Sequence, residues 1–164
     1  MNITEERAGL LAECLEEMNN SLIELTAIFR VKRQVLARAD MEALDDLLAR
    51  EEAVAQALFE AETRREVLVE EIAAATGAPC DRLAGIAATL GEGASEVLID
   101  AGMRLRDTID VLAREARIVA EICKAATDHY DRLIRIITGT TATTTYAPKG
   151  MVAAAGRNII DQSF

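Results

Sequence analysis

The sequence predicts an all-α protein in which an elongated antiparallel helical hairpin has a third long helix packed along it, as in a three-helix bundle. Composition is the first indication: 51% of the 164 residues are hydrophobic, only 3% are aromatic and 28% are charged. This balance is typical of long helices and coiled coils. The second indication is that apolar residues recur at alternating steps of three and four, which places them on one helix face.

The first helix is predicted over residues 4–39. Apolar residues at heptad spacing form its core face: Leu11, Leu15, Met18, Leu22, Leu25 and Phe29, with Leu36 one heptad further along. Asp40 interrupts this pattern. It is a suitable N-cap for a second helix, because its side chain can accept hydrogen bonds from unpaired backbone N–H groups.

The second helix is predicted over residues 41–75. Its apolar residues form the second stripe of the hairpin: Leu44, Leu47, Leu48, Val54, Leu58, Leu68 and Ile72. Gly77 suits the left-handed conformation that ends many helices, and Pro79 cannot continue a helix. A short helix over residues 81–90 then precedes a flexible corner at Gly91-Glu92-Gly93.

The third long helix is predicted over residues 95–138 and has the most regular pattern. Its stripe runs through Leu105, Ile109, Leu112, Ala116, Val119, Cys123, Ala126, Tyr130, Leu133 and Ile137. A stripe sustained over more than four heptads indicates close packing against other helices. Residues 1–138 are therefore predicted to form a helical bundle, and residues 139–164 a threonine-rich linker with a flexible C-terminal tail.

Acidic residues are concentrated in the first half of the chain. Residues 1–78 carry 17 acids and 8 bases, a balance of −9, whereas residues 79–164 carry 11 acids and 10 bases, a balance of −1. This charge disfavours nucleic acid as a partner, since that requires clustered Lys and Arg. The acidic half is either a solvated helical face or a surface that steers a basic partner.

The remaining composition argues against a membrane protein and an enzyme. No apolar run reaches the roughly 18 residues of a membrane span, and the first residues lack a secretory signal, which predicts a cytoplasmic protein without membrane insertion. The three cysteines, Cys14, Cys80 and Cys123, have no CxxC spacing, and Cys14 and Cys123 are predicted to be buried thiols. His129 lacks a second ligand at metal-binding spacing. No cofactor, no metal and no catalytic site are predicted.

What remains is a binding function, and the end of the third helix is the candidate site. Tyr130 and Ile137 belong to the core stripe, but Ile134 and Ile136 lie outside it, so this end is apolar on more than one side. The excess apolar residues indicate either a wider contact with the hairpin or an exposed patch for a partner helix.

The tail supplies the other candidate residues, Tyr146, Met151 and Val152. A segment of this kind cannot form a core alone, but it can become ordered on a partner. Tyr146 would then be an anchor of low side-chain entropy, after a pliable threonine joint. The alternative is a disordered chain end.

These segments together resemble the FlgN family of flagellar export chaperones. The resemblance covers roughly residues 5–150 and is carried by LIELTAIFRVKRQVLARAD followed by MEALDDLLAREEAVAQALFEAETRREVLVEEI. Glu51, Glu52 and Arg65 are similar to charged positions of the family's hairpin. The stretch TTTYAPKG is similar to its threonine-containing tail, with Tyr146 and Gly150 matching the family's Tyr and Gly.

The resemblance implies a cytoplasmic chaperone that binds hook–filament junction proteins, FlgK- and FlgL-like, before their export through the flagellar type III apparatus. It also implies that clients are recognised through the C-terminal region, with export-apparatus components as further partners. Two other functions stay open: a FliT-like chaperone of another flagellar substrate, or a non-enzymatic coiled-coil scaffold that self-associates.

Overall fold

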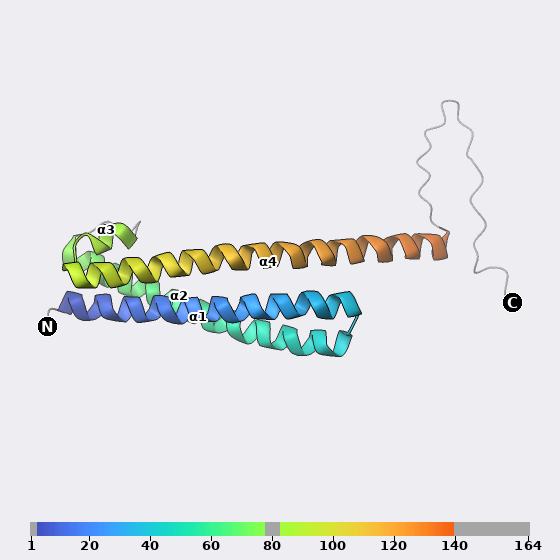
Figure 1. The fold of residues 1–164 in the computed structure, drawn as a ribbon, viewed down its shortest axis with the longest axis horizontal. Coiled ribbons are helices and arrows are strands. Elements are labelled where there is room, and N and C mark those ends of the chain that lie inside the picture. Colours follow the sequence, from blue (N-terminus) through green and yellow to red (C-terminus); the bar gives the residue numbers. More distant parts are fainter. Residues whose placement is uncertain (1–2, 78–82, 140–164) are drawn as a thin grey trace, which may run out of the picture. The chain divides into compact units, whose positions relative to one another are not determined.

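The structure, a computed structural model, describes residues 3–77 and 83–139 and is helical throughout these ranges apart from short connections. Its helices are α1 (Ile3–Arg38), α2 (Met41–Thr76), α3 (Leu83–Ala87) and α4 (Glu92–Thr138) (Figure 1). No strand occurs in the described residues, so the predicted all-α class is confirmed. The chain divides into two compact units, Met1–Val119 and Ala120–Phe164, and the boundary falls inside α4.

The corner between α1 and α2 forms as the sequence predicts. Asp40 is the N-cap of α2, and its Oδ1 accepts a hydrogen bond of 3.1 Å from the backbone N–H of Ala43. At the other end of α2, Gly77 takes the predicted left-handed conformation, with φ of 72°. Ala39 also has a positive φ, 53°, which is unusual for a residue with a Cβ atom.

The corner predicted at residues 91–93 ends at Gly91, so it is wrong for Glu92 and Gly93. α4 begins at Glu92, before the predicted residue 95, and Gly93 lies in its first turn. The backbone N–H of Ser95 donates to the carbonyl of Gly91 at 2.9 Å, which is the first bond of the helix. Gly91 precedes the helix and needs no helical conformation itself.

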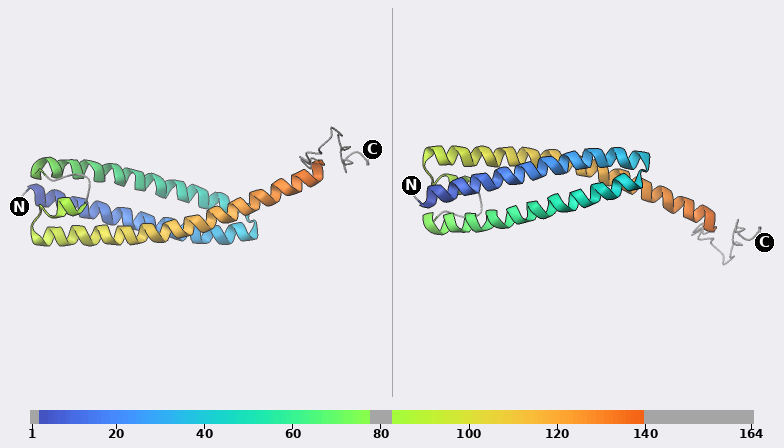
Figure 2. Two further views of the ribbon diagram at one scale, coloured as in Figure 1. Left: turned by 90° about the horizontal axis from the view of Figure 1, so that it is seen from above. Right: turned by 90° about the horizontal axis from the view of Figure 1, so that it is seen from below.

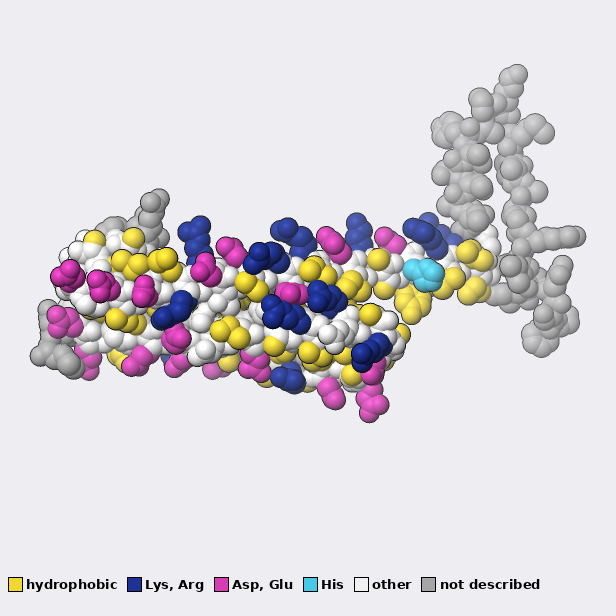
Figure 3. All heavy atoms as spheres, in the orientation of Figure 1, with side chains coloured by type: hydrophobic (Ala, Val, Ile, Leu, Met, Phe, Trp, Pro, Cys, Tyr) yellow, Lys and Arg dark blue, Asp and Glu magenta, His cyan; other side chains and the backbone are white. Residues whose placement is uncertain are grey.

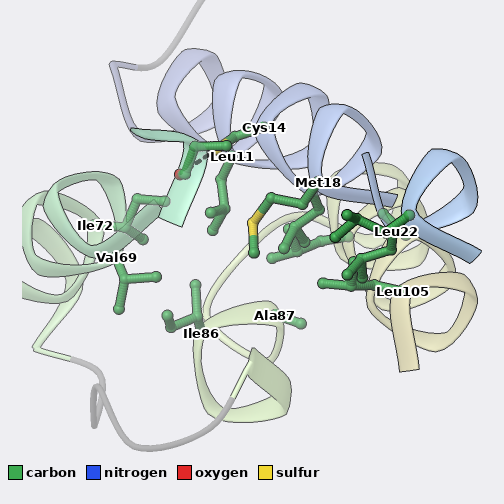
Figure 4. Close-up of a cluster of buried hydrophobic side chains, with 14 residues drawn as sticks. Leu11, Cys14, Met18, Leu22, Val69, Ile72, Ile86, Ala87 and Leu105 are labelled. Atoms are coloured by element: carbon green, nitrogen blue, oxygen red, sulfur yellow. Dashed lines mark hydrogen bonds between the residues drawn. The ribbon is translucent and has the colours of Figure 1, made fainter. Parts of the chain in front are cut away.

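The main core lies in the first unit, between α1, α2, α3 and the part of α4 before residue 120. Figure 2 shows these three long segments side by side, and Figure 4 shows their apolar side chains pointing toward one another. Leu11, Ile72 and Leu98 are completely buried. The predicted core residues of α1 from Leu11 to Leu25 are all buried, which confirms this part of the stripe.

Further along α1 the predicted stripe is wrong. Phe29 and Leu36 are only half-buried, whereas Ile28 and Val35 are buried against Leu47 of α2. Ile28 and Val35 lie two and three heptads after Cys14, whose thiol donates to the carbonyl of Ala61 in α2. They therefore continue the row of α1 side chains that faces α2.

The seam of α4 is also displaced from the prediction. Leu105 and Val119 are buried, but Ile109 is 47% exposed. The row that faces α1 instead consists of Ala101, Thr108 and Glu115, spaced by heptads. Thr108 Oγ1 lies 2.6 Å from Oδ1 of the buried Asn19, and Glu115 forms ion pairs with two arginines of α1, Arg30 and Arg33.

In α2, Leu48 is exposed although the pattern places it in the core, whereas Ala61 and Val69 are buried without having been predicted.

Candidate binding surfaces

The second unit contains one described element, the part of α4 from residue 120 to residue 138. Four of the predicted site residues lie on it: Tyr130, Ile134, Ile136 and Ile137 are 62%, 56%, 60% and 55% exposed. The other three, Tyr146, Met151 and Val152, lie outside the described residues. We call the first four, together with Leu133, the terminal apolar surface.

The terminal apolar surface covers more than one side of the helix. Tyr130, Ile134 and Ile137 are spaced by four and three residues and share a face. Ile136 is turned about 100° from Ile137, because an α-helix has 3.6 residues per turn. Figure 3 shows hydrophobic side chains exposed along these last turns of α4, beside basic ones.

Next to this surface, His129 is exposed, and its ring contacts Tyr130 edge-on with 6.3 Å between ring centroids.

The two described cysteines differ in burial. Cys14 is buried in the first unit, which confirms its prediction, and burial raises the pKa of its thiol. Cys123 is exposed in the second unit, so the prediction of a buried thiol there is wrong. It lies in the heptad row of Ile109, Tyr130 and Ile137, and Ile109 of this row is already 47% exposed in the first unit, because the seam of α4 is displaced from the predicted one.

Of the three hairpin positions of the resemblance, Glu51, Glu52 and Arg65, Glu51 forms an ion pair between two helices. Lys32 of α1 pairs with Glu51 of α2 at 2.5 Å, and both side chains are largely buried. Arg65 forms two hydrogen bonds with Glu62, one turn earlier in the same helix, and these lower the pKa of the Glu62 carboxyl. Glu52 is exposed.

A second surface was not predicted from the sequence. A groove of about 410 Å³ lies between α1 and α2, and we call it the hairpin groove. It is lined by apolar, acidic and other polar side chains: Leu10, Glu13, Cys14, Glu17, Thr63, Arg64, Val67, Leu68 and Glu71. The signal in the sequence was that Leu10 and Val67 lie outside the core stripes. They are 48% and 50% exposed.

Two kinds of site are not found where the structure describes the chain. Its residues contain no group of three or more His, Cys, Asp or Glu side chains that could hold a metal ion. None of its described helices is long and apolar enough to cross a bilayer.

An all-helical architecture with exposed apolar helix surfaces is that of a helical protein-binding protein. Comparison with known families gives the particular one: the model of the FlgN protein family matches residues 8–154. Because the match covers most of the chain, the protein belongs to the FlgN family, a family of flagellar export chaperones. No individual curated protein and no solved structure shows significant similarity to it.

Proposed function

We propose that the protein acts in the cytoplasm and binds hook–filament junction proteins, FlgK- and FlgL-like, keeping them monomeric and competent for export. Membership of the FlgN family supports the chaperone role. The observation that carries the choice of site is the exposure of Tyr130, Ile134, Ile136 and Ile137 on a helix that has no other described element in its unit.

The mechanism is helix packing without covalent chemistry. A client segment that forms an amphipathic helix would expose its apolar face before assembly, and that face would self-associate. The terminal apolar surface can cover it by side-by-side helix packing. The polar residues around this surface carry both signs, for example Asp131 beside Arg132, so apolar contact dominates over charge attraction.

The tail is the second part of the proposed site. Tyr146, Met151 and Val152 would pack on the client after the helix contact has formed. Ordering a tail on binding costs conformational entropy, which keeps the affinity moderate and allows release at the export apparatus. Components of that apparatus are further partners in this proposal.

Calorimetric titration of the full chain with a purified hook–filament junction protein tests the proposal. We expect Ile134→Glu and Ile137→Glu to weaken binding at least about tenfold, which is about 1.4 kcal/mol, because a carboxylate would be buried in an apolar contact. The matched control is Val97→Glu, because Val97 lies on the same helix in the first unit and is equally exposed, at 56%. Tyr146→Ala tests the tail separately.

Three outcomes would contradict parts of the proposal. Unchanged affinity in both isoleucine variants would remove the terminal apolar surface from the site. No binding by the unmodified chain would remove these clients and favour a FliT-like chaperone of another substrate. A tight dimer in sedimentation equilibrium that Ile137→Glu dissociates would favour a self-associating scaffold.

A further inference from the structure

We propose that the hairpin groove between α1 and α2 docks an amphipathic helix of a second, basic partner protein. This inference concerns the first unit and does not depend on the terminal apolar surface. A basic occupant of this groove would make part of the acidic half of the chain a surface for a basic partner rather than a solvated face alone.

The groove is a largely apolar depression between two packed helices. Leu10 of α1 and Val67 of α2 are half-exposed at its sides, and the buried Cys14 lies at its base. The Cys14 thiol donates to the Ala61 carbonyl at 3.1 Å, so α1 and α2 are in direct contact beneath the groove. An exposed apolar patch with polar surroundings is typical of a protein-binding site.

Two ion pairs between α1 and α2 mark the limits of the groove along the direction of the helices. Arg7 pairs with Glu71 at 3.2 Å, one turn before Leu10, and Arg64 pairs with Glu17 at 2.5 Å, on the other side of Cys14. These four side chains are substantially exposed, so the pairs contribute little stability, about 0–1 kcal/mol each. They can exchange partners at low cost when a cation approaches.

Charge identifies the occupant. The lining contains three carboxylates, Glu13, Glu17 and Glu71, and one cation, Arg64. Glu13 lies between the two ion pairs and has no cationic partner within the described residues. A helix that places an apolar side chain between Leu10 and Val67 would therefore gain from a Lys or Arg one turn away, next to Glu13.

A second copy of the chain is a poor occupant of the same groove. Symmetric pairing through this surface would bring two sets of acidic residues together, and the segment 1–78 has a balance of −9. Like charges at an interface oppose association. The same repulsion excludes an acidic client helix, so this surface and the terminal apolar surface select partners by different chemistry.

The test uses the full chain and three fluorescein-labelled peptides of about 18 residues, long enough to form a helix. The first carries Leu on one face and Lys on the other. The second replaces Lys by Glu, and the third keeps Lys but replaces Leu by Ser. We expect fluorescence anisotropy to show saturable binding of the first peptide alone, weakened but not abolished by salt.

Variants locate the binding site. Leu10→Glu and Val67→Glu should each weaken binding of the Leu/Lys peptide about tenfold or more, and Glu13→Lys by a similar factor. The matched controls are Val97→Glu, an exposed valine on α4, and Glu52→Lys, an exposed acid of α2 far from the groove in sequence; both should bind as the unmodified chain does. All these positions are exposed, so helicity by circular dichroism should be unchanged.

The proposal is overturned if the first peptide (Leu and Lys) and the third peptide (Ser and Lys) bind equally, because the attraction is then due to charge alone. It is also overturned if Val97→Glu weakens binding as much as Val67→Glu, or if Ile134→Glu abolishes binding while Leu10→Glu leaves it intact. The last result would assign the peptide to the terminal apolar surface. Loss of client binding in Ile134→Glu with peptide binding retained would separate the two surfaces.

Discussion

The two parts of α4 have similar apolar patterns, but they differ in how far the apolar side chains are buried. Before residue 120 the helix buries Leu98, Leu105 and Val119 in the core of the first unit. After residue 120, Leu133 continues the heptad row of Leu98, Leu105 and Val119 but is 39% exposed, in a unit with no other described element. Periodicity therefore predicts which residues share a face, while burial depends on whether a second element is present to cover that face.

The largest expected effect comes from deleting apolar side chains in each part. Leu11→Ala removes a completely buried side chain and should lower the free energy of unfolding by about 2–5 kcal/mol. Ile137→Ala should change it by less than about 0.5 kcal/mol, because this side chain is 55% exposed. Urea unfolding followed by circular dichroism measures both. Equal losses would mean that the second part of α4 is covered as the first is.

Thiol reactivity should give the next largest contrast. In a chain with Cys80→Ser, Cys14 and Cys123 remain, one buried and the other exposed. We expect Cys123 to react with Ellman's reagent about a hundredfold faster at pH 8. Cys14 can react only after a local opening of the structure. Burial is also the main cause of the raised pKa of its thiol, which lowers the thiolate fraction.

Single-thiol variants, Cys14→Ser and Cys123→Ser, assign the two rates. A Cys123 as slow as Cys14 would break the contrast between the units. An increase in its protection on adding a hook–filament junction protein would sharpen that contrast, because Cys123 lies in the heptad row of Tyr130 and Ile137.

Local rules predicted the helix ends better than the helix seams. The cap at Asp40 and the left-handed Gly77 each depend on a few neighbouring residues, and both are confirmed. The seam of α4 depends on polar residues that an apolar pattern cannot identify. Thr108 and Glu115 face α1 through a hydrogen bond to Asn19 and ion pairs to arginines, and this turns Ile109 outward.

The two candidate surfaces also differ in how far the sequence could predict them. The end of α4 could be selected because Ile134 and Ile136 lie outside the stripe that contains Tyr130 and Ile137, and the roles of all four as client contacts stay predictions. The hairpin groove could not be found from one helix, since Leu10 and Val67 are 57 residues apart in sequence and meet only when α1 and α2 pair.

The smallest expected effect compares the residues that follow α1 and α4. Both have positive φ, but Ala39 (53°) carries a Cβ atom and Gly139 (65°) does not. Ala39→Gly should therefore stabilise the first unit by about 0.5–1 kcal/mol, because relief of the left-handed strain exceeds the entropy that glycine adds to the unfolded chain. Gly139→Ala imposes the same strain on the second unit.

Urea unfolding should show a higher midpoint for Ala39→Gly at constant slope, and a curve for Gly139→Ala that coincides with that of the unmodified chain. The reason is that the hairpin corner belongs to the cooperative core, where α1 ends against α2, whereas the end of α4 can fray without opening the first unit. A lower midpoint in Gly139→Ala would instead couple the last turn of α4 to the core and make the two units one folding unit.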